Sequence, residues 1–434
     1  MANIRFADPA MIDLAAFRAD PQRFRNAWAA RGASVDVEAL LALDARVREL
    51  KFKAETLKAE QNAASKAIGA AAKAGGDALA KAKDAARALG DQAKAIDGER
   101  EAAEQQLTDA VLVVPNPCLA SVPAGKDSGD NRVVATWGQA PTFAFAPKAH
   151  WDLGPALGIM DFERAAKLSG SGFACLKGAG ARLSRALIAW FLDVHTREHG
   201  YTEWAVPFLV SPAAMRGTGQ LPKFADQLYR CAEDDLLLVP TAEVPVTNLH
   251  AGEILDAAAL PVKYTAHTPC FRREAGAAGV GTRGMTRVHQ FDKVEMVWFT
   301  TAERSRADLE TMRGHAEALL RGLGLRHRVL QLCTGDTGFS SACTFDLEVW
   351  SPGTQSWLEV SSCSTFTDFQ SRRAGIRVRG ADGRPQLVHT LNGSGLALPR
   401  CLIAILETYQ QADGSVAVPD VLRPYMGGMD RIVA

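Results

Sequence analysis

The strongest constraint on the fold is a proline-free run over residues 43–110, in which alanine, lysine and glutamate dominate. Two series of residues within it recur at alternating spacings of three and four, the pattern of a heptad seam. The first series is Leu43, Val47, Leu50, Ala54, Leu57, Gln61, Ala64 and Ile68, and the second is Leu79, Ala82, Ala86, Leu89, Ala93, Ile96, Arg100, Ala103 and Leu107. Because Gly75-Gly76 separates them, the sequence predicts two long helices folded back as an antiparallel coiled-coil hairpin, with its arm over about residues 35–110.

Charge and cysteine spacing exclude several classes of protein. The chain has 434 residues with 49 basic and 49 acidic side chains, so bulk positive charge cannot be what holds a nucleic acid. There is no run of about 20 apolar residues and no charged-then-apolar signal pattern at the start, so we expect no membrane partner. The eight cysteines are scattered without a CxxC pair, which predicts reduced thiols in a cytoplasmic protein and no zinc.

The composition changes at Pro115, where three closely spaced prolines end the second long helix. From about Lys148 onward, short β-rich runs alternate with helical runs. Strands are expected at residues 201–207, 236–240, 263–272, 288–300, 344–350 and 357–363, and helices at 181–198 and 399–410. Because few helices of crossover length separate the later strands, the predicted fold class is α+β. We expect a helical hairpin domain at 1–115 and a domain at 116–434 built on an antiparallel sheet flanked by helices.

The second domain lacks the usual nucleophile motifs, but arginine and glutamate are dense on its β-rich segments. There is no GxSxG, no P-loop and no HExxH. A strand–loop–strand hairpin places Arg272, Glu274 and Arg287 near one end, where arginine can bind phosphate or carboxylate and Phe291 can stack on a purine. A solvated hairpin with surface charges is the alternative for these residues.

Two further groups favour phosphate chemistry. If Glu348 and Glu359 share a face of their strand pair, two carboxylates converge, and Ser362 could extend them into a Mg²⁺ site. Arg400 begins the last helix after a glycine-rich approach, Asn392-Gly393-Ser394-Gly395, where a helix N-terminus favours anions. Phosphate-facing arginines, an acidic pair and an aromatic platform without a nucleophile are typical of nucleotidyl transfer, in which positioning and charge stabilisation dominate.

These residues resemble the three motifs of the class II aminoacyl-tRNA synthetases, and most closely those of the seryl-tRNA synthetases. Residues 271–276 with 287–291 and 293–295 resemble motif 2, residues 392–397 with Arg400 and Glu407 resemble motif 3, and the helix at 181–198 with the strand ending at Pro207 resembles motif 1. The stretches 217–224, 241–243 and 359–364 are specific to the seryl enzymes. With the helical hairpin, the resemblance covers essentially the whole chain.

The resemblance implies a homodimeric ligase that activates L-serine with ATP and Mg²⁺ and charges serine tRNA, and selenocysteine tRNA where it exists. The arm would grip the tRNA, with no role for DNA. Arg272, Glu359 and Arg400 would be catalytic. Serine would be bound by Thr241, Ala242, Glu243, Arg272, Glu295, Asn392 and Ser394. ATP would be bound by Arg272, Arg273, Glu274, Arg287, Phe291, Glu359, Val360, Ser361, Ser362 and Arg400, and the metal by Glu359, Ser362 and Glu348.

Some positions depart from the family pattern. Relatives commonly have serine, arginine and aspartate in the motif 2 loop where this chain has Ala277, Val280 and Gly281, a lysine at Cys343 and an arginine at Leu358. Two alternatives therefore stay open beside the tRNA-charging enzyme. One is a specialised paralogue that gives antibiotic self-resistance or supplies activated serine to a biosynthetic pathway. The other is a non-catalytic RNA-binding scaffold.

Overall fold

The computed structural model describes residues 11–74, 76–275 and 283–434. The chain divides into two compact units, one containing Ala33–Val114 with the short helices that precede it and one containing Pro115–Ala434. Each unit has a buried apolar core of its own. Among the described residues, no helix combines the length and the apolar character needed to cross a membrane.

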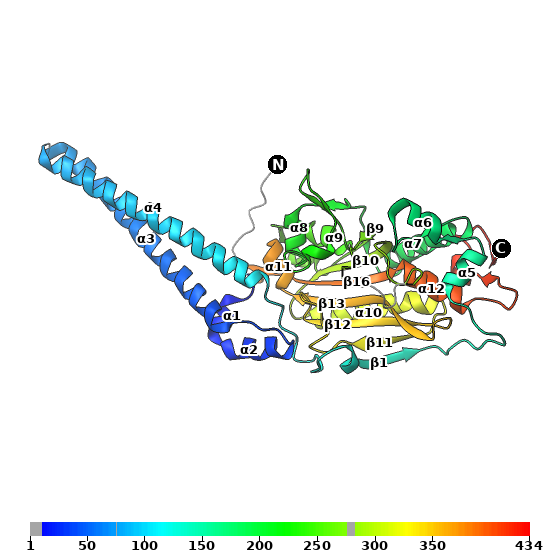
Figure 1. Cartoon of the computed structure of the whole chain (residues 1–434). Coiled ribbons are helices and arrows are strands. Elements are labelled where there is room, and N and C mark those ends of the chain that lie inside the picture. The colour runs from blue at the N-terminus through cyan, green and yellow to red at the C-terminus, as the bar shows by residue number, and fades with distance from the viewer. Residues whose placement is uncertain (1–10, 75, 276–282) are drawn as a thin grey trace. The chain divides into compact units, whose positions relative to one another are not determined.

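The predicted hairpin is present in the helical unit. Helix α3 (Val37–Ala74) and helix α4 (Asp77–Leu112) lie side by side along their length (Figure 1). Helix α3 ends at Ala74 and α4 begins at Asp77, on either side of the Gly75-Gly76 pair that separates the two heptad series. The short helices α1 (Leu14–Ala19) and α2 (Pro21–Ala30) add an aromatic cluster in which the ring centroids of Phe17 and Phe24 lie 5.4 Å apart and those of Phe24 and Trp28 lie 5.5 Å apart.

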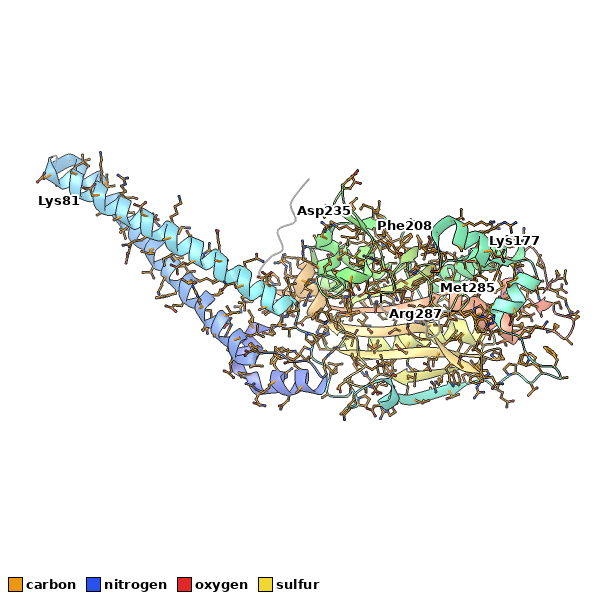
Figure 2. All side chains as sticks on the ribbon, in the orientation of Figure 1. Lys81, Lys177, Phe208, Asp235, Met285 and Arg287 are labelled. Atoms are coloured by element: carbon orange, nitrogen blue, oxygen red, sulfur yellow. The ribbon has the colours of Figure 1, made fainter. Side chains whose placement is uncertain are left out.

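Burial in the hairpin is confined to the half that packs with α1 and α2. Val47 and Leu50 on α3 and Leu107 and Val111 on α4 are buried, but no described residue between Leu50 and Ala103 is. Side chains along this distal part extend away from the two helices (Figure 2). The alanine-rich seam explains this, because small side chains let the helices approach while burying little area per layer. The distal arm therefore presents mostly exposed side chains.

The second unit is organised on an antiparallel-dominated sheet, which confirms the predicted fold class. In the described part of the chain this sheet has eight strands in the order β1-β11-β12-β13-β16-β10-β9-β4, and the pairing of β4 with β9 is parallel while the others are antiparallel. The strands are β1 (Arg132–Trp137), β4 (Thr202–Glu203), β9 (Val262–Phe271), β10 (Gln290–Thr300), β11 (His327–Gln331), β12 (Cys343–Ser351), β13 (Ser356–Thr367) and β16 (His389–Ala397).

Helices and small strands cover this sheet. The helices are α5 (His150–Ala156), α6 (Phe162–Ser169), α7 (Ala179–Arg197), α8 (Pro212–Gly217), α9 (Glu243–Asn248), α10 (Ser305–Gly322), α11 (Phe369–Ala374) and α12 (Leu398–Thr408). The small strands are β2 (Met160–Asp161), β3 (Cys175–Leu176), β5 (Leu209–Val210), β6 (Arg230–Cys231), β7 (Leu236–Leu238), β8 (Ile254–Leu255), β14 (Arg377–Arg379), β15 (Pro385–Leu387), β17 (Val416–Ala417) and β18 (Arg431–Ile432).

Strand β16 and the segment at 201–207 differ from the sequence-based expectation. Residues 392–395 were expected as a glycine-rich approach to the last helix, but they pair with β10 and β13 inside the sheet. The segment at 201–207 forms ladder bonds only at Thr202–Glu203. Pro207 has no backbone N–H to donate, which limits its use in a ladder.

Alternation along β10 determines which side chains reach each face of the sheet. Val294 and Met296 belong to the large apolar core with helices α7, α10 and α12, whereas Val297 and Phe299 belong to a separate core on the other face. Successive side chains of a strand point to opposite faces. Lys293 and Glu295 therefore share the face of Val297, away from α10.

We predict that Leu107→Ala destabilises the helical unit by about 2–5 kcal/mol, because it removes a fully buried side chain and leaves a cavity. The measurement is the urea midpoint of helix loss, followed by circular dichroism. Phe52→Ala is the matched control on the same hairpin, since Phe52 is 71% exposed and its loss should change stability by less than about 0.5 kcal/mol. Equal effects of the two substitutions would show that the core is not where the structure places it.

Candidate active site

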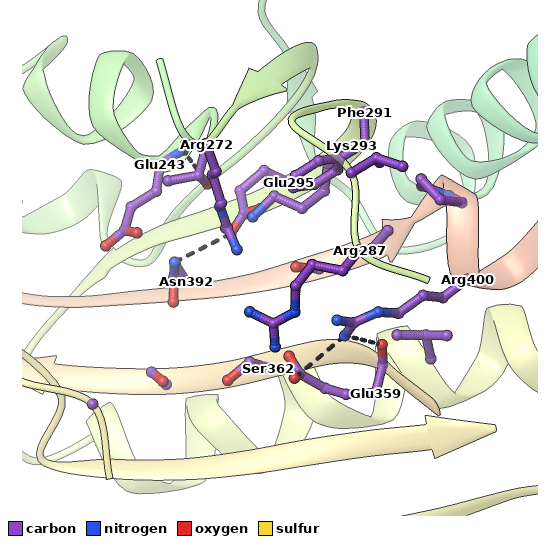
Figure 3. A pocket seen from close by; sticks show the side chains of 18 of the residues that line it. Glu243, Arg272, Arg287, Phe291, Lys293, Glu295, Glu359, Ser362, Asn392 and Arg400 are labelled. Atoms are coloured by element: carbon purple, nitrogen blue, oxygen red, sulfur yellow. Dashed lines mark hydrogen bonds and ion pairs between the residues drawn. The ribbon is translucent and has the colours of Figure 1, made fainter. Parts of the chain in front are cut away.

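A cavity of about 460 Å³ lies over strands β10, β13 and β16. Thirteen of the residues predicted from the sequence line it: Thr241, Glu243, Arg272, Glu274, Arg287, Phe291, Glu295, Glu359, Val360, Ser362, Asn392, Ser394 and Arg400. Ala242, Arg273, Ser361 and Glu348 do not. Figure 3 shows that Glu243, Arg272, Glu295 and Asn392 gather at one end, with Arg287, Glu359, Ser362 and Arg400 at the other.

The first end holds an acid buried beside an arginine. Glu243 begins α9 and its Oε1 accepts a hydrogen bond of 2.6 Å from Gln370 Nε2. Burial raises the pKa of Glu243 to about 7, with a further contribution from the nearby Glu295 carboxylate. Arg272, just past the end of β9, is fixed by a bond of 3.3 Å from its Nε to the Pro240 carbonyl. This end can bind a group that carries both a cation and an anion.

The floor of this end is an ion pair on strand β10. Lys293 Nζ lies 2.5 Å from Glu295 Oε2, and both side chains are buried. Asn392 Nδ2 on β16 donates to the other oxygen, Glu295 Oε1, at 3.1 Å. Among the described side chains, Glu295 Oε2 receives no hydrogen bond of good geometry, although Lys293 neutralises its charge. The floor therefore presents a buried polar surface whose charge is neutralised within the pair.

Lys293 is a lining residue that the sequence-based prediction missed. The motif 2 resemblance includes Lys293 but implies no role for it. The signal for it was the alternation of Phe291, Lys293 and Glu295 along one strand, which places all three on one face.

The opposite end holds two arginines, each paired with a carboxylate. Arg287 Nη1 lies 2.7 Å from Glu274 Oε2. Arg400 Nη1 donates to the Glu359 carbonyl at 2.6 Å and lies 3.4 Å from Glu359 Oε2. Both arginines keep part of their surface exposed to the cavity, so a polyanionic ligand could reach them.

The chain turns sharply at Glu274. This residue has a φ of +47°, a conformation that is uncommon for a residue other than glycine. Arg287 on the returning segment can therefore reach the Glu274 carboxylate.

The acidic group near Glu359 differs from the predicted pair. Glu348 lies opposite Glu359 in the register of β12 and β13, but its carboxylate is 2.5 Å from Arg328 Nε and does not line the cavity. Asp346, which lies opposite Ser362, was not singled out from the sequence. Burial and the nearby Glu359 carboxylate raise the pKa of Asp346 well above its usual value, and its Oδ1 has no hydrogen-bond partner among the described residues.

These oxygens suit a hard cation better than a soft one. Mg²⁺ is usually bound by one or two carboxylates together with substrate phosphate oxygens. Glu359 and Ser362, which line the cavity, supply that chemistry. Among the described residues there is no cluster of three or more His, Cys, Asp or Glu that could hold a metal without such a ligand.

The backbone of β16 is supported from behind by helix α7. Buried His195 contacts the Gly395 carbonyl through Nε2 at 3.2 Å, and a Cβ on Gly395 would lie 2.2 Å from that nitrogen. Burial lowers the pKa of His195 to about 3, so the imidazole is neutral near pH 7. The absence of a side chain at Gly395 therefore lets the strand that carries Asn392 and Ser394 pack directly on His195.

Comparisons with known proteins match nearly the whole chain. The family model described as the seryl-tRNA synthetase N-terminal domain matches residues 11–118, and the class II tRNA synthetase core domain (G, H, P, S and T) matches residues 227–409. The serine--tRNA ligase of Nitratidesulfovibrio vulgaris (strain DSM 19637 / Miyazaki F) is 53% identical over 425 residues, covering 98% of this chain and 100% of that relative. The chain belongs to the seryl-tRNA synthetase family.

Other relatives agree with this assignment. The serine--tRNA ligase of Citrifermentans bemidjiense is 51% identical, covering 97% of this chain and 100% of that relative. Among solved structures, seryl-tRNA synthetase from Pyrococcus horikoshii complexed with ATP is 35% identical, with a TM-score of 0.89 and coverage of 97% of this chain and 99% of that one. The class II resemblance read from the motifs is thus confirmed.

The departures from the seryl-tRNA synthetase pattern lie in different environments. Ala277, Val280 and Gly281 lie outside the described residues. Cys343 is buried and its Sγ accepts a bond of 3.0 Å from Arg306 Nη1. Leu358 packs against the large apolar core. Neither Cys343 nor Leu358 lines the cavity.

We predict that Lys293→Met lowers the stability of the catalytic unit by about 3–5 kcal/mol, because it leaves Glu295 buried without its cation. The double variant Lys293→Met/Glu295→Gln should recover part of the loss, since the buried charge is then removed as well. Urea unfolding of the four proteins of this cycle measures the coupling. Simple additivity of the two single changes would mean that the side chains do not form the pair described.

Proposed function

We propose that this protein activates L-serine with ATP to seryl-adenylate and transfers the seryl group to the 3′ end of serine tRNA, and of selenocysteine tRNA where present. Family membership supports the reaction. The single observation that carries the substrate assignment is a cavity with a buried acid and a neutralised polar floor at one end and two arginines at the other. A small amino acid fits the first end and a triphosphate fits the second.

Each end suggests roles for named residues. Thr241 and Glu243 would bind the serine ammonium group, and Arg272 its carboxylate together with the α-phosphate. Glu295, Asn392 and Ser394 would surround the hydroxymethyl group, with the Glu295 carboxylate and the Asn392 amide as the polar groups nearest the hydroxyl. A site built to pair with a hydroxyl disfavours alanine, because the buried polar groups would then be left unpaired.

The nucleotide would lie from Phe291 toward the second end. Its adenine would stack on Phe291 and meet Glu274, while Arg287 and Arg400 would bind the terminal phosphates. Mg²⁺ held by Glu359 and Ser362 would neutralise phosphate charge when bound. Arg287 and Arg400 would exchange their carboxylate partners for phosphate oxygens, which offer arginine the same bidentate geometry.

Charge stabilisation and positioning account for both steps. A carboxylate oxygen of serine attacks the α-phosphorus and forms a P–O bond as the bond to the leaving pyrophosphate breaks. Arg272 stabilises the negative charge that develops on the α-phosphate oxygens. A terminal ribose hydroxyl of tRNA then attacks the seryl carbonyl, and AMP leaves. Neither step needs a protein nucleophile, and none was found by motif.

The partners follow from the same proposal. The exposed distal hairpin would bind tRNA by its shape, as neutral total charge requires, and α7 with the motif 1 resemblance supports a homodimer. Because tRNA charging takes place where translation occurs, we place the enzyme in the cytoplasm. Full-length similarity to serine--tRNA ligases favours this function over the specialised paralogue and the scaffold.

We predict that Arg272→Ala lowers serine-dependent ATP–pyrophosphate exchange by at least about 10²-fold, because it removes the cation placed at the reacting phosphate. Arg87→Ala, on the exposed surface of the arm, is the control and should leave exchange unchanged. No serine-dependent exchange by the wild-type protein would refute the proposed activity.

We predict that shortening the arm by removing residues 58–92 spares exchange but abolishes charging of serine tRNA. A short glycine turn replaces the removed residues, because Leu57 and Gln92 line one hollow between the two helices, and none of the removed residues that the structure describes is buried. Exchange and charging are measured on the same preparation. Undiminished charging would rule out the role given to the arm.

We predict that the KM for serine rises about tenfold between pH 8 and pH 6 at saturating ATP. Glu243 must be ionised to bind an ammonium group, and its pKa of about 7 means that the carboxylate form is lost as the pH falls through neutrality. Glu243→Gln should raise the KM at pH 8 and remove its pH dependence over this range. A flat wild-type profile would argue against Glu243 as the ammonium ligand.

A further inference from the structure

A buried histidine–glutamate pair lies outside the cavity and has no role in the mechanism above. His150 begins helix α5 and Glu407 lies near the end of α12, and both side chains are fully buried. The His150 Nδ1 and Glu407 Oε1 atoms are 3.0 Å apart, and the His150 backbone N–H donates to the same oxygen at 2.9 Å.

Both carboxylate oxygens of Glu407 accept hydrogen bonds. Its second oxygen, Oε2, accepts a hydrogen bond from Ser351 Oγ and another of 3.0 Å from the Gly353 backbone N–H. The carboxylate thus accepts from two segments that are far apart in the chain, His150 and Ser351–Gly353. A buried carboxylate with all its partners in place has one orientation, so it can fix the ring that it faces.

The partners of His150 decide its tautomer. The backbone N–H of Met285 donates to His150 Nε2 at 3.0 Å. An amide N–H can only donate, so Nε2 must carry the lone pair. The proton of the neutral ring is then on Nδ1, where it donates to Glu407 Oε1. Glu407 therefore holds the imidazole in the form that can accept from Met285.

The segment fixed in this way leads directly to the arginines of the cavity. Gly284 has a φ of +70°, and a Cβ on it would lie 2.1 Å from His150 Nε2, so the backbone sits against the ring. Two residues after Gly284, the carbonyl of Thr286 accepts a bond of 3.3 Å from Arg400 Nε. Arg287 follows and lines the cavity; Met285 and Arg287 are labelled in Figure 2.

We propose that His150, oriented by Glu407, is a positioning residue for the nucleotide: through the Met285 amide it fixes Thr286 and Arg287 and, through Thr286, Arg400. It touches no substrate. The inference rests on the proposed function, because it assigns the two arginines to the phosphates of ATP. If His150 only filled the core, its substitution would lower stability and would change the KM for ATP and the KM for serine alike.

Two substitutions in the full-length protein separate these roles. In His150→Gln the side-chain oxygen can reach the place of Nε2 and accept from Met285. In His150→Asn the shorter amide can occupy the place of Nδ1 and donate to Glu407, but Met285 loses its acceptor. Both variants are measured by ATP–pyrophosphate exchange, for the KM of ATP and the KM of serine, and by thermal unfolding.

We expect His150→Asn to raise the KM for ATP at least tenfold while the KM for serine stays within twofold, and His150→Gln to restore the KM for ATP to within threefold of wild type. Equal KM values for ATP in the two variants, or a parallel rise of both KM values, would overturn the role of His150. If His150→Asn does not fold, Ser351→Ala decides, since it removes one donor to Glu407 and should raise the KM for ATP alone by twofold to fivefold. No effect of that substitution would then overturn the proposal.

The wild-type protein in the same assay keeps the two proposals distinguishable. If the wild-type protein carries out serine-dependent exchange but the variants change the KM for ATP and the KM for serine alike, only the role of His150 is refuted. No exchange by wild type refutes the proposed function and the inference that rests on it.

Discussion

The register of β10 between β9 and β16 is the constraint on which the site depends. It sets Glu295 opposite Ser394 and Phe291 opposite Cys270, next to the end of β9 where Arg272 begins the turn. Lys293 and Glu295 then face the cavity, while Val294 and Met296 enter the apolar core. Because the side-chain period of a strand is two residues, a slip of one residue would put the ion pair into that core and apolar side chains into the cavity.

The cavity face of the sheet can carry buried charged side chains because these side chains are paired. Buried ions are costly unless they have partners, and each charged group at the deep end has one: Lys293 with Glu295, Glu295 with Asn392, and Glu243 with Gln370. At the opposite end of the cavity, Arg287 and Arg400 are paired with carboxylates that a polyanion can replace. The zero net charge of the chain is thus compatible with binding ATP and tRNA, since local arrangement, and not total charge, supplies the attraction.

Much of this could be predicted from the sequence because the signals are local. The heptad spacing and the Gly75-Gly76 break identified the hairpin, and the helices at 181–198 and 399–410 differ from α7 and α12 by one or two residues. β16 was missed because glycine weakens the strand signal, and here it is needed where the backbone packs on His195.

The remaining differences are set by contacts between distant segments. Glu348 was expected to converge with Glu359, but Arg328 on the neighbouring strand pairs with it. The partnership of His150, Glu407 and Met285 joins three segments and leaves no trace in spacing. Such contacts depend on the tertiary fold, so reading one segment at a time cannot find them.

The central proposal is that the buried floor formed by Lys293, Glu295 and Asn392 binds the serine hydroxyl, next to the end of the cavity that binds phosphate. The most direct test is to compare the affinities of the protein for non-hydrolysable seryl-adenylate and alanyl-adenylate analogues by titration calorimetry. We expect the alanyl analogue to bind about 10⁴-fold more weakly, because the polar groups of Glu295 and its neighbours lose the hydroxyl that pairs with them. Affinities within tenfold of each other would contradict it.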